Sequence, residues 1–180
     1  MTAPANIVLV GFMGTGKTCV GRRLAARLDL RFVDMDLLLE ERAGKPIARI
    51  FAEDGEPRFR ALERALAGEL ATRSGLVIAT GGGVVLDPDN VRDFSRTGLV
   101  VCLRATPEAI LRRVASETHR PLLAGGDRLA KIAALLESRR RLYDAILHQV
   151  DTTECSVAEV AERIVALLRE RNEPRTSRPG

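Results

Sequence analysis

The sequence predicts an α/β protein, a three-layer α/β/α sandwich with a five-stranded parallel sheet. Two observations support this prediction. Short apolar runs alternate with longer amphipathic stretches along the chain, and the apolar runs lack the strict alternation of half-exposed strands. This arrangement is typical of parallel strands that are joined by right-handed helical crossovers and buried on both faces. The predicted strands cover residues 7–10, 31–34, 76–79, 99–103 and 149–151.

Helical periodicity fills the stretches between these strands. The predicted helices cover residues 17–28, 57–73, 107–116, 129–147 and 157–171. Residues 36–60 interrupt the alternation of strands and helices, because a helical stretch, LLLEERAG, is followed there by a polar segment with Gly55 and Pro57. Residues 116–128, SETHRPLLAGGDR, interrupt this alternation a second time. A loop of this length in a compact domain is typical of a lid or a binding loop, so we expect a mobile lid at about residues 114–128.

Length and composition are those of one globular domain. The 180 residues are 46% hydrophobic and 29% charged, and they contain no internal repeat and no domain linker. We expect a single domain over residues 1–171. The last residues, 172–180, are rich in Pro and charge, and we expect them to form a disordered tail.

Arginine supplies nearly all of the positive charge. Of the 28 basic residues only Lys17, Lys45 and Lys131 are lysines, and the formal net charge is +4. Because Arg binds carboxylate and phosphate through a planar fork, this bias suits a protein that handles anions, although a high-GC codon bias explains the excess equally well. The basic residues are scattered among acids, and no basic run is interleaved with aromatics. We therefore expect no nucleic-acid partner.

The cysteines and the lengths of the apolar runs indicate in which cellular compartment the protein works. Cys19, Cys102 and Cys155 lie far apart and form no Cys-x-x-Cys pair, so we expect reduced thiols in a cytosolic protein. No stretch reaches the ~18 apolar residues of a membrane span, and the first residues carry no charged segment of a signal peptide. We expect a cytoplasmic protein with no membrane partner.

The strongest local pattern is GFMGTGKT, residues 11–18, which fits G-x-x-x-x-G-K-[ST]. It follows the apolar run IVLV and opens a predicted helix, which is the context that a phosphate-binding loop (P-loop) requires. Glycines let backbone N–H groups approach phosphate oxygens, the lysine neutralises the β- and γ-phosphates, and the threonine supplies a hydroxyl for Mg²⁺. The predicted nucleotide-binding residues in this region are Gly14, Thr15, Gly16, Lys17, Thr18 and Cys19.

Other features narrow the class of nucleotide-binding protein. A GTPase would carry Asn-Lys-x-Asp, and no lysine of this chain follows an Asn, while a large motor ATPase needs far more chain. A small-molecule kinase remains. Asp34 and Asp36 stand at the end of the second predicted strand, where ligands bind in open α/β sheets. Phosphoryl transfer to a hydroxyl needs such a carboxylate to orient or deprotonate the acceptor.

An ordered set of motifs resembles the shikimate kinase family over nearly the whole chain. The motifs are GFMGTGKT (11–18), DMD (34–36), FRALE (59–63), TGGG (80–83), RPLL (120–123) and RRRLY (139–143). The resemblance implies a P-loop kinase fold of the nucleoside-monophosphate-kinase type, with a substrate-binding segment at about residues 36–63. It also implies transfer of the γ-phosphoryl of ATP to the 3-hydroxyl of shikimate, giving shikimate 3-phosphate and ADP.

The resemblance assigns roles in the acceptor site. Asp36 would hold ring hydroxyls of shikimate and act as the base. Arg60 and Arg139 would clamp the substrate carboxylate. Glycines after the third predicted strand would let backbone N–H groups approach the substrate, and the sequence agrees, because bare backbone at a strand end donates without steric cost. The implied substrate-binding residues are Asp36, Arg60, Gly81, Gly82, Gly83 and Arg139.

The resemblance also assigns roles on the nucleotide side. Arg120, on the lid, would close over the phosphates, so that the implied catalytic residues are Lys17, Asp36 and Arg120. Thr18 and Asp34 would hold one Mg²⁺ per subunit, Asp34 through water. Arg113, or its neighbour Arg112, would stack on adenine.

Two departures from the family pattern fall in these regions. Arg141 stands where the family usually has Pro, two residues before the Tyr, and the run Arg139, Arg140, Arg141 leaves the register of the carboxylate clamp open. Glu154 and Cys155 stand where relatives often place a basic residue near the adenine.

Two alternatives compete with this interpretation. The first is another small-molecule P-loop kinase, such as a gluconate or nucleoside monophosphate kinase. The second is a nucleotide-dependent switch without catalytic turnover. A compact acidic polyol fits an aspartate, two arginines and a glycine run better than a nucleotide acceptor does. We expect ATP and shikimate as the partners of a monomeric enzyme.

Overall fold

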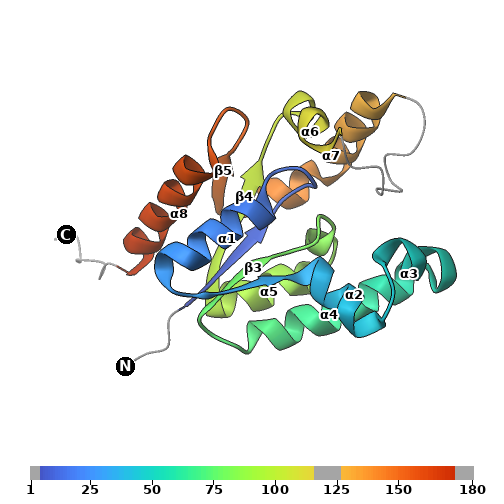
Figure 1. Cartoon of the computed structure of the whole chain (residues 1–180), viewed down its shortest axis with the longest axis horizontal. Helices are drawn as coiled ribbons and strands as arrows, with labels where there is room; N and C mark the ends of the chain where they lie inside the picture. Colours follow the sequence, from blue (N-terminus) through green and yellow to red (C-terminus); the bar gives the residue numbers. More distant parts are fainter. Residues whose placement is uncertain (1–4, 116–126, 173–180) are drawn as a thin grey trace, which may run out of the picture.

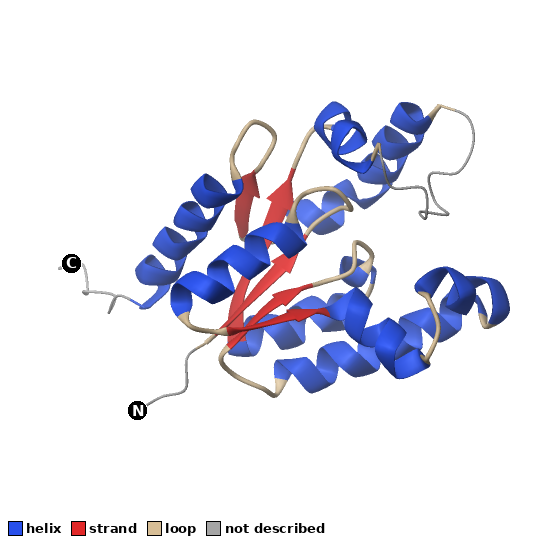
Figure 2. Cartoon of the chain, in the orientation of Figure 1, coloured by secondary structure: helices blue, strands red, loops and turns tan. Residues whose placement is uncertain are grey.

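The computed structural model describes residues 5–115 and 127–172. Its centre is a five-stranded parallel sheet in the order β2-β3-β1-β4-β5, which Figures 1 and 2 show with helices on both faces. The strands are β1 (Asn6–Val10), β2 (Arg31–Asp34), β3 (Leu76–Ala79), β4 (Gly98–Arg104) and β5 (His148–Asp151). The predicted three-layer α/β/α class with a five-stranded parallel sheet is therefore confirmed.

Helices connect these strands. They are α1 (Lys17–Leu28), α2 (Met35–Ala43), α3 (Ile47–Glu53), α4 (Gly55–Ala71), α5 (Pro88–Thr97), α6 (Pro107–Val114), α7 (Arg128–Asp144) and α8 (Val157–Asn172), with the short 3₁₀ helix η1 (Val84–Leu86). Each predicted helix has a counterpart. The segment 36–60, expected to continue as a polar stretch after one helix, also holds α3 and the start of α4.

Helix α5 was not predicted. It presents Val91 and Phe94 to the core and carries few other apolar residues, so its sequence has little of the apolar pattern by which a buried helix is recognised. Its start is nevertheless encoded locally, because the Asp87 side chain accepts a hydrogen bond from the Asp89 N–H (2.9 Å) and Pro88 occupies the first turn. An Asp-Pro pair of this kind favours a helix start.

The central strand β1 divides the core between the two faces of the sheet. Ile7 and Leu9 pack against α1 and α8, and the alternate residues Val8 and Val10 pack on the opposite face. There they meet α4, α5 and α7, through residues such as Leu66, Leu70, Phe94, Ile132 and Tyr143. Because both faces are covered, the three inner strands β1, β3 and β4 are nearly continuous apolar runs, whereas the edge strands β2 and β5 are more polar.

Strand β1 lies between β3 and β4, while β2 pairs with β3 at one edge. The chain thus continues to one side of β1 through β2 and β3, and to the other through β4 and β5. Ligands of open α/β sheets bind outside the carboxyl ends of the strands at such a switch of direction. The segments that follow β1, β2 and β3 all begin at this edge (Figure 1).

In the described parts of the chain, no helix is both long and apolar enough to span a membrane.

Candidate active site

The segment between β1 and α1 forms a tight loop around the start of α1. Gly11, Gly14 and Gly16 have φ values of 137°, 75° and 96°, which side chains rarely adopt. At Gly14 a Cβ would also lie 2.8 Å from Val114 Cγ1 of α6. Because Gly16 caps α1 without a side chain, the first N–H groups of the helix point toward the cleft, as an anion site requires.

Lys17 is held inside this loop. Its side chain is 9% exposed, and Nζ donates to the carbonyl oxygens of Gly11 and Phe12, both at 2.8 Å. The loop therefore fixes the ammonium beside the N–H groups at the start of α1. Thr15 is also buried, and its hydroxyl donates to the Phe12 carbonyl at 2.7 Å.

Thr18 and Asp34, the predicted metal-binding pair, lie in direct contact. Thr18 Oγ1 donates to Asp34 Oδ2 at 2.8 Å. The other oxygen of Asp34 caps α2, because it accepts from the N–H groups of Asp36 (3.1 Å) and Leu37 (3.4 Å). A hydroxyl and a carboxylate are the oxygen ligands with which Mg²⁺ is bound beside phosphates. The pair therefore fits that ion, although the described residues hold no cluster of three or more His, Cys, Asp or Glu.

The acceptor side is built around the glycine run that follows β3. A Cβ on Gly81 would lie 2.7 Å from Asp36 Oδ1 and 3.0 Å from Glu63 Oε1. A Cβ on Gly83 would lie 2.5 Å from Arg60 Nη1. Both glycines are needed for this close approach of charged side chains to the backbone. The structure thus brings Asp36, Arg60 and Glu63 together against one short loop.

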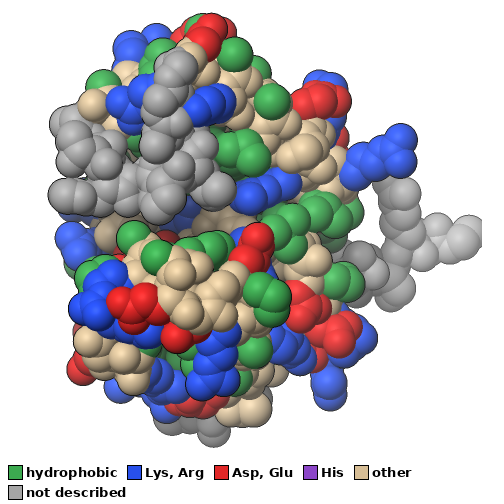
Figure 3. Space-filling view, turned by 90° about the vertical axis from the view of Figure 1, so that its right-hand side faces the viewer, with side chains coloured by type: hydrophobic (Ala, Val, Ile, Leu, Met, Phe, Trp, Pro, Cys, Tyr) green, Lys and Arg blue, Asp and Glu red, His purple; other side chains and the backbone are tan. Residues whose placement is uncertain are grey.

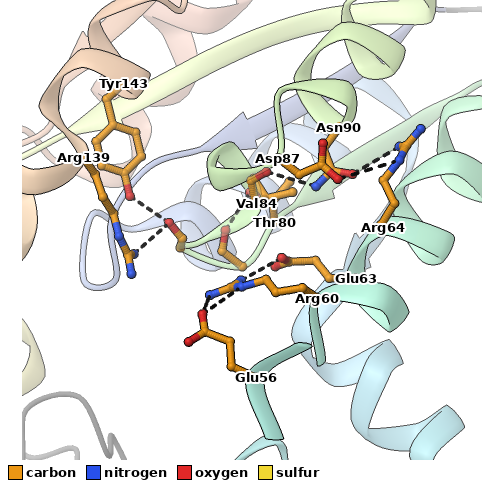
Figure 4. Close-up of polar contacts among 12 residues, drawn as sticks. Glu56, Arg60, Glu63, Arg64, Thr80, Val84, Asp87, Asn90, Arg139 and Tyr143 are labelled. Atoms are coloured by element: carbon orange, nitrogen blue, oxygen red, sulfur yellow. Dashed lines mark hydrogen bonds and ion pairs between the residues drawn. The ribbon is translucent and has the colours of Figure 1, made fainter. Parts of the chain in front are cut away.

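Arg60 and Glu63 form an ion pair on one face of α4, shown in Figure 4. Arg60 Nη1 lies 2.7 Å from Glu63 Oε2, and Arg60 Nη2 lies 3.0 Å from Glu56 Oε1. Glu63 is 2% exposed, and within the described residues its Oε1 has no hydrogen-bond partner. Burial raises the pKa of Glu63, an effect that Arg60 opposes and that the nearby Asp36 reinforces.

Glu63 was not among the predicted site residues. It entered the sequence interpretation only as the last letter of FRALE. The signal that could have found it is its spacing, since an acid three residues after Arg60 on a helix shares its face.

Helix α7 contributes Arg139 and Tyr143 to the opposite side of the glycine run. The Tyr143 hydroxyl donates to the Gly82 carbonyl at 2.7 Å, and Arg139 Nη1 donates to the same oxygen at 3.3 Å (Figure 4). Burial raises the pKa of Tyr143 to about 12, so the phenol keeps its proton. Tyr143 was not predicted as a site residue.

The geometry separates the three successive arginines. Arg139 is 9% exposed, and its guanidinium lies 5.9 Å from the centre of the Phe12 ring. Arg140 and Arg141 are exposed, and Arg140 pairs with Glu137 on the surface. Of the three, Arg139 alone lies beside the glycine run.

A cavity of about 700 Å³ lies along the P-loop and reaches Asp34, Asp36 and Gly82, and its volume suits a nucleotide-sized ligand. Its walls come from the P-loop, the segments at the ends of β2 and β3, helix α6 and the segment after β5. The lining residues include Met13, Gly14, Thr15, Gly16, Lys17, Thr18, Cys19, Asp34, Asp36, Thr80, Gly82, Arg113, Thr152, Cys155 and Ser156. The space-filling view in Figure 3 shows a hollow between the part that carries α6 and α7 and the part that carries α2, α3 and α4.

The two candidates for adenine stacking differ in their contacts. Arg113 donates to the carbonyl oxygens of Gly14 (3.3 Å) and Thr153 (3.2 Å) and to the Thr152 hydroxyl (3.0 Å). Arg112 lies on the surface, 3.4 Å from Glu154. Arg113 therefore lines the cavity, and Arg112 does not.

Three sequence predictions fall outside the described residues. They are Arg120, most of the lid at 114–128, and nearly all of the tail at 172–180.

The fold and this site define a class, the P-loop kinases that phosphorylate small molecules. The family model of shikimate kinase matches residues 13–169. The chain belongs to the shikimate kinase family, as the sequence motifs predicted. A shikimate kinase of Pelotomaculum thermopropionicum is 50% identical over 167 residues, which is 93% of this chain and 97% of the relative. A shikimate kinase of Desulforudis audaxviator is 49% identical over 92% of this chain and 87% of the relative.

Solved structures agree with this membership. The shikimate kinase of Acinetobacter baumannii in complex with shikimate superposes with a TM-score of 0.89 at 35% identity, covering 95% of this chain and 96% of the other. A gluconokinase of Sinorhizobium meliloti superposes with a TM-score of 0.60 at 19% identity, covering 95% of each chain. The second likeness is one of fold alone.

Proposed function

We propose that this chain transfers the γ-phosphoryl group of ATP to the 3-hydroxyl of shikimate, giving shikimate 3-phosphate and ADP. Membership of the shikimate kinase family supports this activity. The observation that carries the assignment of residues is the contact of Asp36, Glu63 and Arg60 with the glycine run 81–83, directly beside the P-loop.

Shikimate is an anionic polyol, so its site needs cations for the carboxylate and an acid for the hydroxyls. Arg60 and Arg139 lie against Gly83 and Gly82, on two sides of one loop. In our proposal both guanidinium groups bind the carboxylate of shikimate through charge-assisted hydrogen bonds. Glu63 holds the Arg60 fork in place and does not itself neutralise the substrate.

Asp36 orients the acceptor hydroxyl and accepts its proton. The residue lies in the first turn of α2, where its backbone N–H donates to the side chain of the capping residue Asp34. Its carboxylate lies beside Gly81 and also lines the nucleotide cavity. This position between the two substrates is what a general base for in-line transfer requires.

The nucleotide phosphates bind to the P-loop N–H groups and to Lys17, which offset the charge of the transferring group. Thr18 and Asp34 are the residues that would hold Mg²⁺, one ion per subunit. When bound there, Mg²⁺ would offset the negative charge of the nucleotide phosphates. Arg120, for which the resemblance implies a phosphate contact, remains a predicted catalytic residue.

A coupled ADP-release assay with Mg-ATP tests the proposed activity. The arms are shikimate, gluconate, AMP and no acceptor. We expect release with shikimate and background rates in the other three arms. Equal rates with gluconate would favour the alternative of another small-molecule P-loop kinase. A slow rate of ADP release that no acceptor changes would favour a nucleotide-dependent switch without catalytic turnover.

We further propose that the protein works as a cytoplasmic monomer. Its three cysteines are unpaired, which is consistent with a reducing compartment. Sedimentation equilibrium across a wide concentration range would give a single mass of 19.6 kDa if the chain is monomeric.

A further inference from the structure

Thr152, the first residue after β5, is a polar side chain buried at the edge of the nucleotide cavity. It is 3% exposed. Its hydroxyl lies 3.1 Å from the Thr15 carbonyl oxygen, 3.0 Å from the Arg104 carbonyl oxygen and 3.0 Å from Arg113 Nη1. Thr152 therefore contacts the P-loop, the end of β4 and helix α6 through one hydroxyl.

Arg113 makes the complementary connection from α6. Besides the Thr152 hydroxyl and the carbonyl oxygens of Gly14 and Thr153, its guanidinium contacts the Thr152 carbonyl oxygen. All four acceptors belong either to the P-loop or to the segment after β5. The side chains of Thr152 and Arg113 thus form a clasp, which joins the Gly14 and Thr15 carbonyl groups to residues 152–153.

The two clasped carbonyl groups belong to the part of the P-loop that surrounds the phosphates. A peptide unit is planar, so fixing its C=O also fixes the direction of the N–H of the next residue. The clasp therefore orients the N–H of Gly16, while the N–H of Thr15, in the peptide of the Gly14 carbonyl, donates within the loop to the Phe12 carbonyl at 3.4 Å. A loop held in its binding conformation before the ligand arrives binds more tightly, because less conformational freedom is lost on binding.

We propose that Thr152 is a positioning residue for the nucleotide phosphates and that it acts on the P-loop together with Arg113. In this proposal the guanidinium of Arg113 donates to the P-loop, a role that is separate from any contact of its plane with the adenine base. Acceptor binding is independent of the clasp, since Arg60 and Arg139 reach the glycine run from other elements. The proposal requires only that the P-loop binds phosphates, and so it can be tested apart from the proposed reaction.

The test compares a nucleotide with a ligand that has phosphates but no base. Calorimetry measures the binding of ADP, inorganic tripolyphosphate and shikimate, each with Mg²⁺, to the wild type and to Thr152→Val. Losing a buried hydroxyl that accepts from Arg113 and shares its one proton between the Thr15 and Arg104 carbonyl oxygens should weaken ADP and tripolyphosphate alike, by about tenfold, and leave shikimate binding unchanged. Thr152→Ser, which restores the hydroxyl, should return both affinities to within about twofold of the wild type.

Thr72→Val is the matched control, because the Thr72 hydroxyl also donates to a backbone carbonyl (Glu69, 2.8 Å), but Thr72 directly follows α4 and does not line the cavity. We expect no change in any of the three affinities. In turnover, Thr152→Val should raise KM for ATP by about tenfold while kcat stays within about twofold.

Two results would overturn the proposal. Weaker binding of ADP with unchanged tripolyphosphate would place the effect at the base, and equal losses for ADP and shikimate would indicate general damage to the fold. Arg113→Lys, a change to an exposed side chain that keeps the charge, provides a second test. It should weaken tripolyphosphate as well as ADP, because a lysine cannot make all the hydrogen bonds of the clasp, whereas unchanged tripolyphosphate binding would overturn the proposal.

Discussion

The two halves of the active site are built in different ways. The nucleotide half is a continuous segment, residues 11–18, whose backbone makes the site and whose one buried cation, Lys17, is held by loop carbonyls. The acceptor half consists of charged side chains from α2, α4 and α7 that converge on three glycines. A local motif therefore specifies the first half, while only the tertiary fold assembles the second.

This difference separates the expected effects of mutations. A change in the nucleotide half should act on the phosphates and leave shikimate binding intact. A change in the acceptor half should act on shikimate and leave nucleotide binding intact.

Among the variants that act on one half alone, the largest effect is expected for Lys17→Met. The side chain loses the ammonium that offsets charge on the transferring group, so kcat/KM should fall by about 10²- to 10³-fold. Steady-state kinetics give this ratio, and calorimetry with shikimate should show unchanged affinity. Lys45→Met, at a half-buried lysine paired with Glu53 and Asp54, is the matched control. Normal turnover of Lys17→Met would contradict the assigned role.

Arg60→Ala should act on the other half. It removes a charged donor to the substrate carboxylate, and we expect KM for shikimate to rise by about 10- to 100-fold with KM for ATP unchanged. Arg64→Ala is the control from the next turn of α4, where the arginine pairs with Asp93 away from the glycine run. Equal changes in both KM values would mean that the halves are not independent.

Glu63→Gln should make the stability difference from the wild type depend on pH. The folded-state pKa of Glu63 is raised above the ordinary value of 4.5, chiefly by burial. The folded protein thus holds a proton that the unfolded chain loses, and this contribution to stability is lost as pH rises from 4.5 through the folded pKa. Urea unfolding across this range should show the wild type losing stability relative to Glu63→Gln as pH rises. A difference that does not vary with pH would exclude the raised pKa.

The smallest effect is expected for Tyr143→Phe. It removes the hydroxyl that donates to the Gly82 carbonyl, and the free energy of unfolding should fall by about 1 kcal/mol. Because Gly82 lies at the junction of the two halves, this variant also tests how rigid the glycine run must be. A several-fold rise in KM for shikimate with unchanged stability would show that Tyr143 acts on the substrate directly.

The same contrast explains what the sequence could predict. Buried parallel strands are apolar runs, and the P-loop pattern is contiguous, so both were found from neighbouring residues. Helix α5 was missed because it buries few apolar side chains, and its Asp87-Pro88 start was the stronger signal.

The acceptor residues could be named only through the family resemblance. Nothing local distinguishes Arg60 or Arg139 from the many other arginines. Glu63 and Thr152 were missed because their roles depend on partners distant in sequence, such as Gly81 and Thr15. Burial of a charged or polar side chain is a tertiary property, and it singled out both residues once the fold was known.

The central claim is that Asp36 joins the two halves as the base for the acceptor hydroxyl. The most direct test measures shikimate-dependent ADP release by Asp36→Asn, together with shikimate binding to the same protein. We expect turnover to fall by about 10²- to 10⁴-fold while shikimate still binds, since the amide keeps the shape but accepts a proton poorly. Turnover within a few-fold of the wild type would contradict the claim.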